Sequence, residues 1–265
     1  RLSLRGLGVG FSAPRLLLLT APGSAQDVEL ELLEGDADHH LNLVVEADLA
    51  TDSSLSLCLL QDQDRSGFAT TTFAARVAAD AKLDGVWLDC GAQLARHDVQ
   101  VDLAEPGAQA DLAGLMLPRA DQHQDHHIHV RHGASNTTSS QLFKGLVASK
   151  GRSVFSGCVE VCEGAQGCTA DQLSRGLLLG DGAEFDARPQ LLISYDAVEA
   201  SHGTSCGAMD EDALFFMRSR GLDEAQARAL LAQGFAGEVL EQSGASEFNA
   251  RALKAVEDLV AGYQP

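Results

Sequence analysis

Residues 40–49 read "HLNLVVEADL", and this stretch decides which kind of fold to expect. Apolar side chains recur at every second position, at Leu41, Leu43 and Val45. A period of two places alternate side chains on one face, which is typical of a β-strand. The stretches "SLSLCLL" at 54–60 and "VQVDL" at 99–103 repeat the pattern. Residues 1–207 are therefore predicted to form a body of short strands.

The turns between these strands also repeat. A small residue, then Ala, then Gln or Glu occurs at 24–26, 91–93, 107–109, 164–166 and 182–184. Repetition at the scale of a strand plus a turn favours a coiled sheet whose turns stack on one another, with the Ala pointing inward at each bend. An antiparallel sandwich is the alternative on pattern alone. Long amphipathic helices are scarce here, which argues against a βαβ fold.

Residues 208–265 have a helical period instead. Asp210 is a predicted N-cap for a helix through "EDALFFMRSR", and Gly221 is its predicted C-terminal stop. Asp223 with Gln226 predicts a second helix start, and Ser246 a third. The second helix carries one apolar stripe, formed by Ala227, Leu231, Phe235 and Val239. We therefore expect a β core over 1–207 and a helical subdomain over 208–265.

Composition limits the possible partners and compartments. The chain has 265 residues, 45% of them hydrophobic, and a formal net charge of −19. Such a charge disfavours nucleic acid and anionic membranes. The apolar run at 16–19 is too short to span a bilayer. We expect the six cysteines to be free thiols in the cytoplasm. Because the first residue is Arg1, we expect the chain to be part of a longer protein.

Two clusters suggest metal binding without establishing it. Five histidines fall between His123 and His132, around the stretch "DHHIHVRH" at 125–132. Alternating histidines on a strand can chelate a divalent metal. A solvated strand face, with His132 hydrogen-bonded inside, explains them equally. Cys158, Cys162 and Cys168 are open to the same two interpretations, as a labile zinc or iron–sulfur site or as small buried residues.

No catalytic motif stands out. The sequence has no GxSxG, no Walker lysine loop and no GxGxxG before a helix. Asp125 lies beside the histidines of residues 125–132, but no nucleophile can be assigned to act with them. The sequence therefore does not predict an enzyme.

One long stretch resembles a known family. Residues 189–221 read "PQLLISYDAVEASHGTSCGAMDEDALFFMRSRG" and are similar to the signature of the SufB/SufD family of iron–sulfur cluster assembly proteins. Further matches precede this stretch, at Asp125, His126, His132, Ser140, Gln141 and Lys144. The Ser201–His202–Gly203 segment resembles the SufD branch, although Ala200 stands where the family often has Cys. The resemblance runs from about residue 27 to the end, and we expect the chain to lack the additional N-terminal helical region of the family.

The resemblance implies a fold and a function. The fold would be a right-handed parallel β-helix with a C-terminal α-helical subdomain. The chain would be a non-catalytic scaffold that pairs with a SufB-like paralogue, or with itself, and binds a SufC-like ATPase. A transient iron–sulfur cluster at the partner interface would take His202 as a ligand, with no permanent cofactor in the isolated chain. A structural role for His202, capping the strand-to-helix turn, is the alternative. The implied SufC-binding region includes Leu214, Phe215, Met217, Phe235 and Val239.

Two other functions remain possible at this point. One is a stand-alone metal-binding β-helix protein that uses the His and Cys clusters. The other is a carbohydrate-acting enzyme on a β-helix, which needs a cleft lined by acids and aromatics. The chain has only one Trp and two Tyr.

Overall fold

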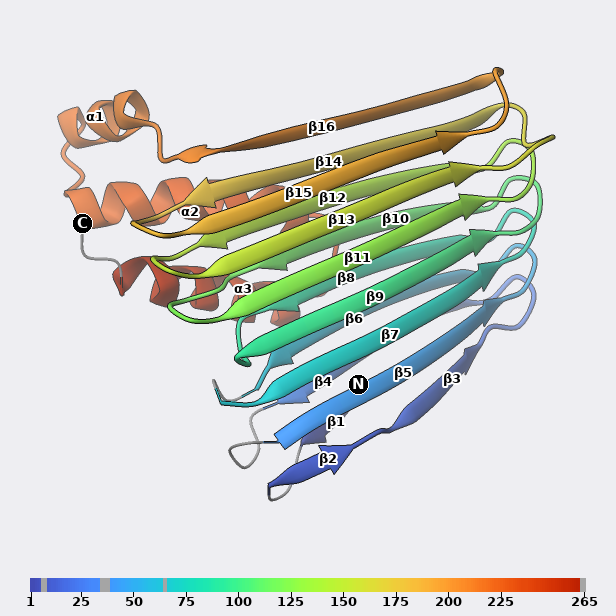
Figure 1. The fold of residues 1–265 in the computed structure, drawn as a ribbon, viewed down its shortest axis with the longest axis horizontal. Coiled ribbons are helices and arrows are strands. Elements are labelled where there is room, and N and C mark those ends of the chain that lie inside the picture. The colour runs from blue at the N-terminus through green and yellow to red at the C-terminus, as the bar shows by residue number, and fades with distance from the viewer. Residues whose placement is uncertain (6–8, 34–38, 64–65, 263–265) are drawn as a thin grey trace.

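The computed structural model describes residues 1–5, 9–33, 39–63 and 66–262, which form sixteen strands and three helices. From β4 (Ala25–Leu33) to β16 (Val198–Ala208), successive strands alternate between two sheets, and each strand pairs with the strand two places earlier or later (Figure 1). All strand pairs among the described residues are parallel. The prediction of a parallel β-helix is confirmed, and the sandwich and βαβ alternatives are excluded.

Each sheet contains eight strands. Sheet A runs in the order β1 (Leu2–Arg5), β4, β6 (Ser54–Asp62), β8 (Lys82–Asp89), β10 (Gln109–Met116), β12 (Thr138–Val147), β14 (Cys168–Leu178) and β16. Sheet B runs in the order β15 (Glu184–Ile193), β13 (Arg152–Val161), β11 (His123–His132), β9 (Leu94–Leu103), β7 (Phe68–Val77), β5 (His39–Leu49) and β2 (Gly10–Ser12), and β3 (Arg15–Leu19) also pairs with β5.

Alternating side chains fill the space between the sheets. Leu41, Leu43 and Val45 of the opening stretch are at most 2% exposed, as their period of two predicts. The register is kept from turn to turn, so Val99 on β9 lies level with Phe73 on β7 and Ile128 on β11. Stacking of equivalent positions therefore builds one continuous apolar core.

The repeated turns behave as predicted at three of their five positions. Ala92, Ala108 and Ala165 are fully buried at the bends. Ala183 is only half-buried, and Ala25 is exposed, so the inward prediction is wrong for Ala25.

Two of the three described helices begin where their capping residues predict, and the third begins at the predicted residue. Asp210 accepts hydrogen bonds from the backbone N–H groups of Asp212 and Ala213 and caps α1 (Glu211–Ser219). Asp223 and Gln226 form a capping box at the start of α2 (Glu224–Leu240). The third helix, α3 (Ser246–Ala261), starts at Ser246 without a side-chain cap. Gly221 follows α1 with a φ of +97°, a left-handed conformation that suits glycine after a helix end.

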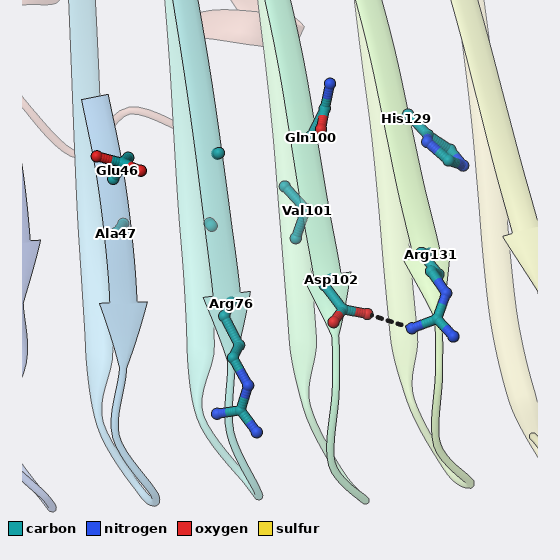
Figure 2. Close-up of a pocket in the computed structure, with 10 residues that line it drawn as sticks. Glu46, Ala47, Arg76, Gln100, Val101, Asp102, His129 and Arg131 are labelled. Carbon is teal, nitrogen blue, oxygen red and sulfur yellow. Dashed lines mark hydrogen bonds and ion pairs between the residues drawn. The ribbon is translucent and has the colours of Figure 1, made fainter. Parts of the chain in front are cut away.

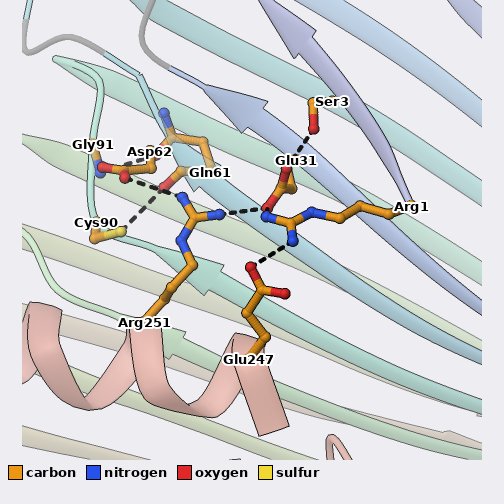
Figure 3. Close-up of polar contacts among 9 residues, drawn as sticks. All are labelled: Arg1, Ser3, Glu31, Gln61, Asp62, Cys90, Gly91, Glu247 and Arg251. Atoms are coloured by element: carbon orange, nitrogen blue, oxygen red, sulfur yellow. Dashed lines mark hydrogen bonds and ion pairs between the residues drawn. The ribbon is translucent and has the colours of Figure 1, made fainter. Parts of the chain in front are cut away.

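The helices pack on the outer face of sheet A. Their apolar side chains share a core with outward-facing residues of that sheet, such as Leu88 and Leu115. A polar network adds a second attachment at the N-terminal strands (Figure 3). Glu31 on β4 accepts hydrogen bonds from Arg1, Ser3 and Arg251, and Arg1 also contacts Glu247 on α3 at 2.5 Å. The helices therefore cover part of the outer face of sheet A.

Candidate functional site

The C-terminal end of the β-helix is formed by two edge strands. Among the described strands, β16 pairs only with β14, and β15 only with β13. Each therefore presents an unpaired row of backbone N–H and C=O groups at the end of the stack (Figure 1). Side chains that would be enclosed by a further turn, Leu191, Val198 and Ala200, are only partly buried. This end has the features of a surface that another strand can continue.

His202 lies on this edge. It belongs to β16, level with Gln172 on β14, and its side chain is exposed. The strand continues to Ala208, and the cap of the following helix is Asp210. This arrangement argues against a capping role for His202. The segment around His202 is extended strand, so the imidazole stands on an element of regular structure.

The neighbouring edge strand presents apolar side chains. Leu192 is 53% exposed and Ile193 is 44% exposed at the end of β15. Pro189 sits within the same strand, where the lack of an N–H is tolerated because the strand is at an edge. Apolar side chains beside an unpaired edge are typical of a surface that a partner covers.

The cysteines do not converge on one site. All six are free, and Cys206 on β16 is the exposed one. Cys168 is buried, with its Sγ 3.1 Å from Oγ1 of Thr137. Burial and the nearby Glu160 raise the pKa of Cys158, which keeps it a protonated thiol. The predicted Cys158, Cys162 and Cys168 cluster does not form a three-ligand group in the described structure.

The helical residues singled out in the sequence have different environments. Leu214 and Val239 lie in the core shared with sheet A, and Phe235 and Met217 pack against that core. Phe215 is 75% exposed. Phe216, 57% exposed, lies beside it and was not predicted. Phe215 and Phe216 thus form the accessible apolar part of α1.

Lys144 from the family pattern joins the β-helix to the helical part. Its side chain is fully buried on β12, and its Nζ donates to the backbone carbonyl of Phe235 at 2.8 Å. The same Nζ lies 2.7 Å from Oε2 of Glu238 on α2. Burial lowers the pKa of Lys144, and the hydrogen bond and charge of Glu238 oppose that shift. This contact fixes α2 against sheet A.

The histidine-rich stretch forms β11, and its side chains divide between the two faces. His127 and His129 point outward and contact Asp125 and Glu160. His132 is buried, with its ring nitrogens 2.8 Å from Oγ1 of Thr137 and 2.9 Å from Oγ of Ser139. The prediction of an internally hydrogen-bonded His132 is confirmed. His126 also points inward, and its carboxylate partner is Asp89 on β8.

A hollow of about 460 Å³ lies on the outer face of sheet B (Figure 2). Its charged groups are engaged with acids, since Arg131 contacts Asp102 at 2.9 Å and Arg76 contacts Glu105 at 2.8 Å. No Trp, Tyr or Phe is among its described lining residues. The hollow therefore gives no support to a carbohydrate-acting enzyme.

Comparison with known proteins shows the family of the chain. The profile described as "SUF system FeS cluster assembly, SufBD core domain" matches residues 5–235. The chain belongs to the SufBD family. A SufBD family protein of Synechocystis is 33% identical over 205 residues, which cover 76% of this chain and 44% of that protein. The chloroplastic protein ABCI7 of Arabidopsis thaliana is 30% identical over 252 residues, covering 94% of this chain and 53% of that protein.

The chain is also similar to part of a protein named SufD. The iron–sulfur cluster assembly protein SufD of Escherichia coli is 32% identical over 151 residues, 57% of this chain and 36% of that protein. The chain thus spans about half the length, or less, of these SufBD relatives. None of the described helices combines the length and the apolar content needed to cross a membrane.

Proposed function

We propose that the chain is a SufD-like scaffold subunit of an iron–sulfur cluster assembly complex in the cytoplasm. In this proposal the edge strands β15 and β16 continue into the β-helix of a SufB-like paralogue. The chain performs no catalytic step of its own. It supplies half of a platform on which iron and sulfur are brought together.

The observation that carries the proposal is the position of His202. An exposed imidazole stands on the edge strand β16, and the other edge strand, β15, carries exposed apolar side chains. Imidazole is a suitable ligand for iron, and a single ligand from one chain leaves the remaining positions to a partner. Ligands shared across an interface suit a cluster that must be released after assembly. His202 is therefore the proposed ligand of the nascent cluster.

The helical part suits a second partner. Phe215 and Phe216 are exposed on α1, while the rest of the predicted set packs inside. We assign these two aromatic side chains to contact with a SufC-like ATPase. Lys144 and Glu238, 2.7 Å apart, would transmit movement of α2 to sheet A.

The test is His202→Ala in a complex reconstituted with the SufB-like and SufC-like partners. We expect the complex to form as usual, because the side chain is exposed, and cluster formation to fall by at least about tenfold. Cluster formation is followed by the visible absorption and circular dichroism of the iron–sulfur chromophore. His129→Ala is the control, because the half-exposed His129 lies on the outer face of sheet B, away from the edge strands. Cluster formation at the normal rate in His202→Ala would contradict the proposed role.

A further inference from the structure

Three buried side chains that the proposed function does not use meet inside the β-helix. Nε2 of His97 lies 2.8 Å from Oδ1 of Asp89, and Nε2 of His126 lies 2.6 Å from Oδ2 of the same carboxylate. All three side chains are fully enclosed. Their ligand atoms lie within 4.8 Å of one another, and in the described part of the chain no other group of three His, Cys, Asp or Glu side chains does so.

The strand register brings these residues together. Asp89 is the last residue of β8 in sheet A, and its side chain points to the space between the sheets. His97 and His126 are level with each other on β9 and β11 of sheet B. Apolar groups surround them, because the His126 ring lies 5.4 Å from the ring of Phe143 and Met116 is level with Asp89. The cluster is thus a polar group enclosed by apolar side chains, and it links the two sheets.

The cluster is incomplete as a hydrogen-bonded group. No described Lys or Arg lies within ion-pair distance of the Asp89 carboxylate. Enclosed carboxylates in proteins are normally paired with a cation or coordinate a metal. The Nδ1 atoms of His97 and His126 have no described hydrogen-bond partner. The same holds for both amide atoms of the fully buried Gln124, two residues before His126.

We propose that Asp89, His97 and His126 bind one divalent first-row transition-metal ion, such as Zn²⁺, between the two sheets. Two imidazoles and one carboxylate form a ligand set that Zn²⁺ takes in proteins, and the second carboxylate oxygen can supply a fourth ligand atom. The N–O separations must open by roughly half an ångström to admit an ion with bonds of about 2.0 Å. That change is within reach of side-chain rotation.

Metal binding would also explain why hydrogen-bond acceptors without partners lie near the two imidazoles. With Nε2 on the metal, each imidazole carries its proton on Nδ1 and needs an acceptor there. Two unpaired acceptors occupy adjoining positions: Oγ1 of Thr71, which is level with His97, and Oε1 of Gln124. The ion would hold β8, β9 and β11 together and would be separate from any cluster bound at His202.

The test measures metal in the full chain, refolded from denaturant with excess Zn²⁺ or Co²⁺ because the site is enclosed. After removal of loose metal, we expect about one ion per chain by elemental analysis. With Co²⁺ we expect the intense visible bands of a four-coordinate site. His97→Gln and His126→Gln keep a side-chain N–H that can donate to Asp89, and both should lose at least about nine-tenths of the metal.

A matched control separates this site from general histidine binding. His132→Gln removes an equally buried histidine of β11 whose partners are hydroxyl groups, and it should retain the metal. Zn²⁺ should raise the melting temperature of the wild type and of His132→Gln, but not of the two ligand variants. A wild-type chain that binds no Zn²⁺ and gives no Co²⁺ bands would overturn the proposal, whether or not the variants fold. Unchanged metal content in His97→Gln and His126→Gln would also overturn it.

Discussion

The interior of the β-helix differs between its N-terminal and its C-terminal turns. Between β4 and β6 most enclosed positions are aliphatic, as at Leu32, Leu43 and Leu57, and His39 and Gln61 are polar exceptions. Enclosed polar side chains are more frequent from β9 onward, at His97, Gln124, His126, His132, Ser139, Gln141, Ser153, Gln172 and Ser174. One ladder of level residues shows the change, running from Leu43 through Thr71 and His97 to His126.

The two kinds of interior have different effects on the stability of the fold. Aliphatic side chains give the N-terminal turns their favourable burial at little cost. Buried polar groups without partners lower stability, and no described one precedes Gln61. The C-terminal turns, which lead to the open edge at β15 and β16, therefore carry features that stability alone does not explain.

The largest effect is expected when the polar character is moved into the N-terminal turns. Leu43→Gln places an amide among aliphatic neighbours, and we expect it to lower the free energy of unfolding by about 3–5 kcal/mol. Urea denaturation measures this change. Leu17→Gln is the control, because Leu17 is 61% exposed and should change stability by less than about 0.5 kcal/mol. A loss below about 1 kcal/mol for Leu43→Gln would contradict the contrast between the two interiors.

The polar interior should also respond to acid. Burial lowers the pKa of His132 from 6.5 to about 4. The unfolded chain binds this proton more readily than the folded chain does. The contribution of neutral His132 to the free energy of unfolding is therefore complete above about pH 6.5 and is lost as the pH falls towards 4. The loss reaches about 3 kcal/mol at its limit. We expect His132→Gln to show a shallower decline in stability than the wild type between about pH 7 and pH 4.5, measured by urea denaturation. Parallel declines would show that His132 is not responsible.

The smallest effect is expected where two buried polar groups are replaced together. Nε2 of Gln172 donates to Oε1 of Gln141 at 2.8 Å, while the other amide atom of each residue lacks a described partner. Changing both residues to Met should alter the free energy of unfolding by no more than about 1 kcal/mol, because no amide is left unpaired. Gln172→Met alone should cost about 1–3 kcal/mol, because it isolates Gln141. A double variant less stable than the single variant would show that the pair itself stabilises the fold.

Much of the fold could be predicted because hydrophobic periodicity, turn residues and helix caps are patterns of residues close in sequence. The period of two in "HLNLVVEADL" identifies a half-enclosed strand, and the recurring turn residues identify a coil. Asp210 and Asp223 marked the helix starts because capping depends on residues close in sequence. The exposure of Ala25 could not be foreseen, since the turn pattern is the same there as at the buried Ala92.

The candidate sites were harder to predict, because they combine residues distant in the chain. His202 was found through a family resemblance, and nothing near it in sequence reveals that β16 is an edge strand. The sequence drew attention to His126, but its partner Asp89 lies 37 residues earlier and on the other sheet. Register between strands decides such pairings, and register follows from the whole stack. The period of two does place His126 and His132 on the same face of the strand.

The most direct test compares the two ends of the β-helix as surfaces for the SufB-like partner. Leu192→Lys with Ile193→Lys charges the exposed side chains of β15, and Leu17→Lys with Leu19→Lys charges those of β3, which are 61% and 60% exposed. Complex formation is measured by titration calorimetry and light scattering. We expect the β15 variant to weaken binding by at least about tenfold and the β3 variant to bind like the wild type. Wild-type affinity in the β15 variant, or a loss of binding confined to the β3 variant, would contradict pairing through the C-terminal edge.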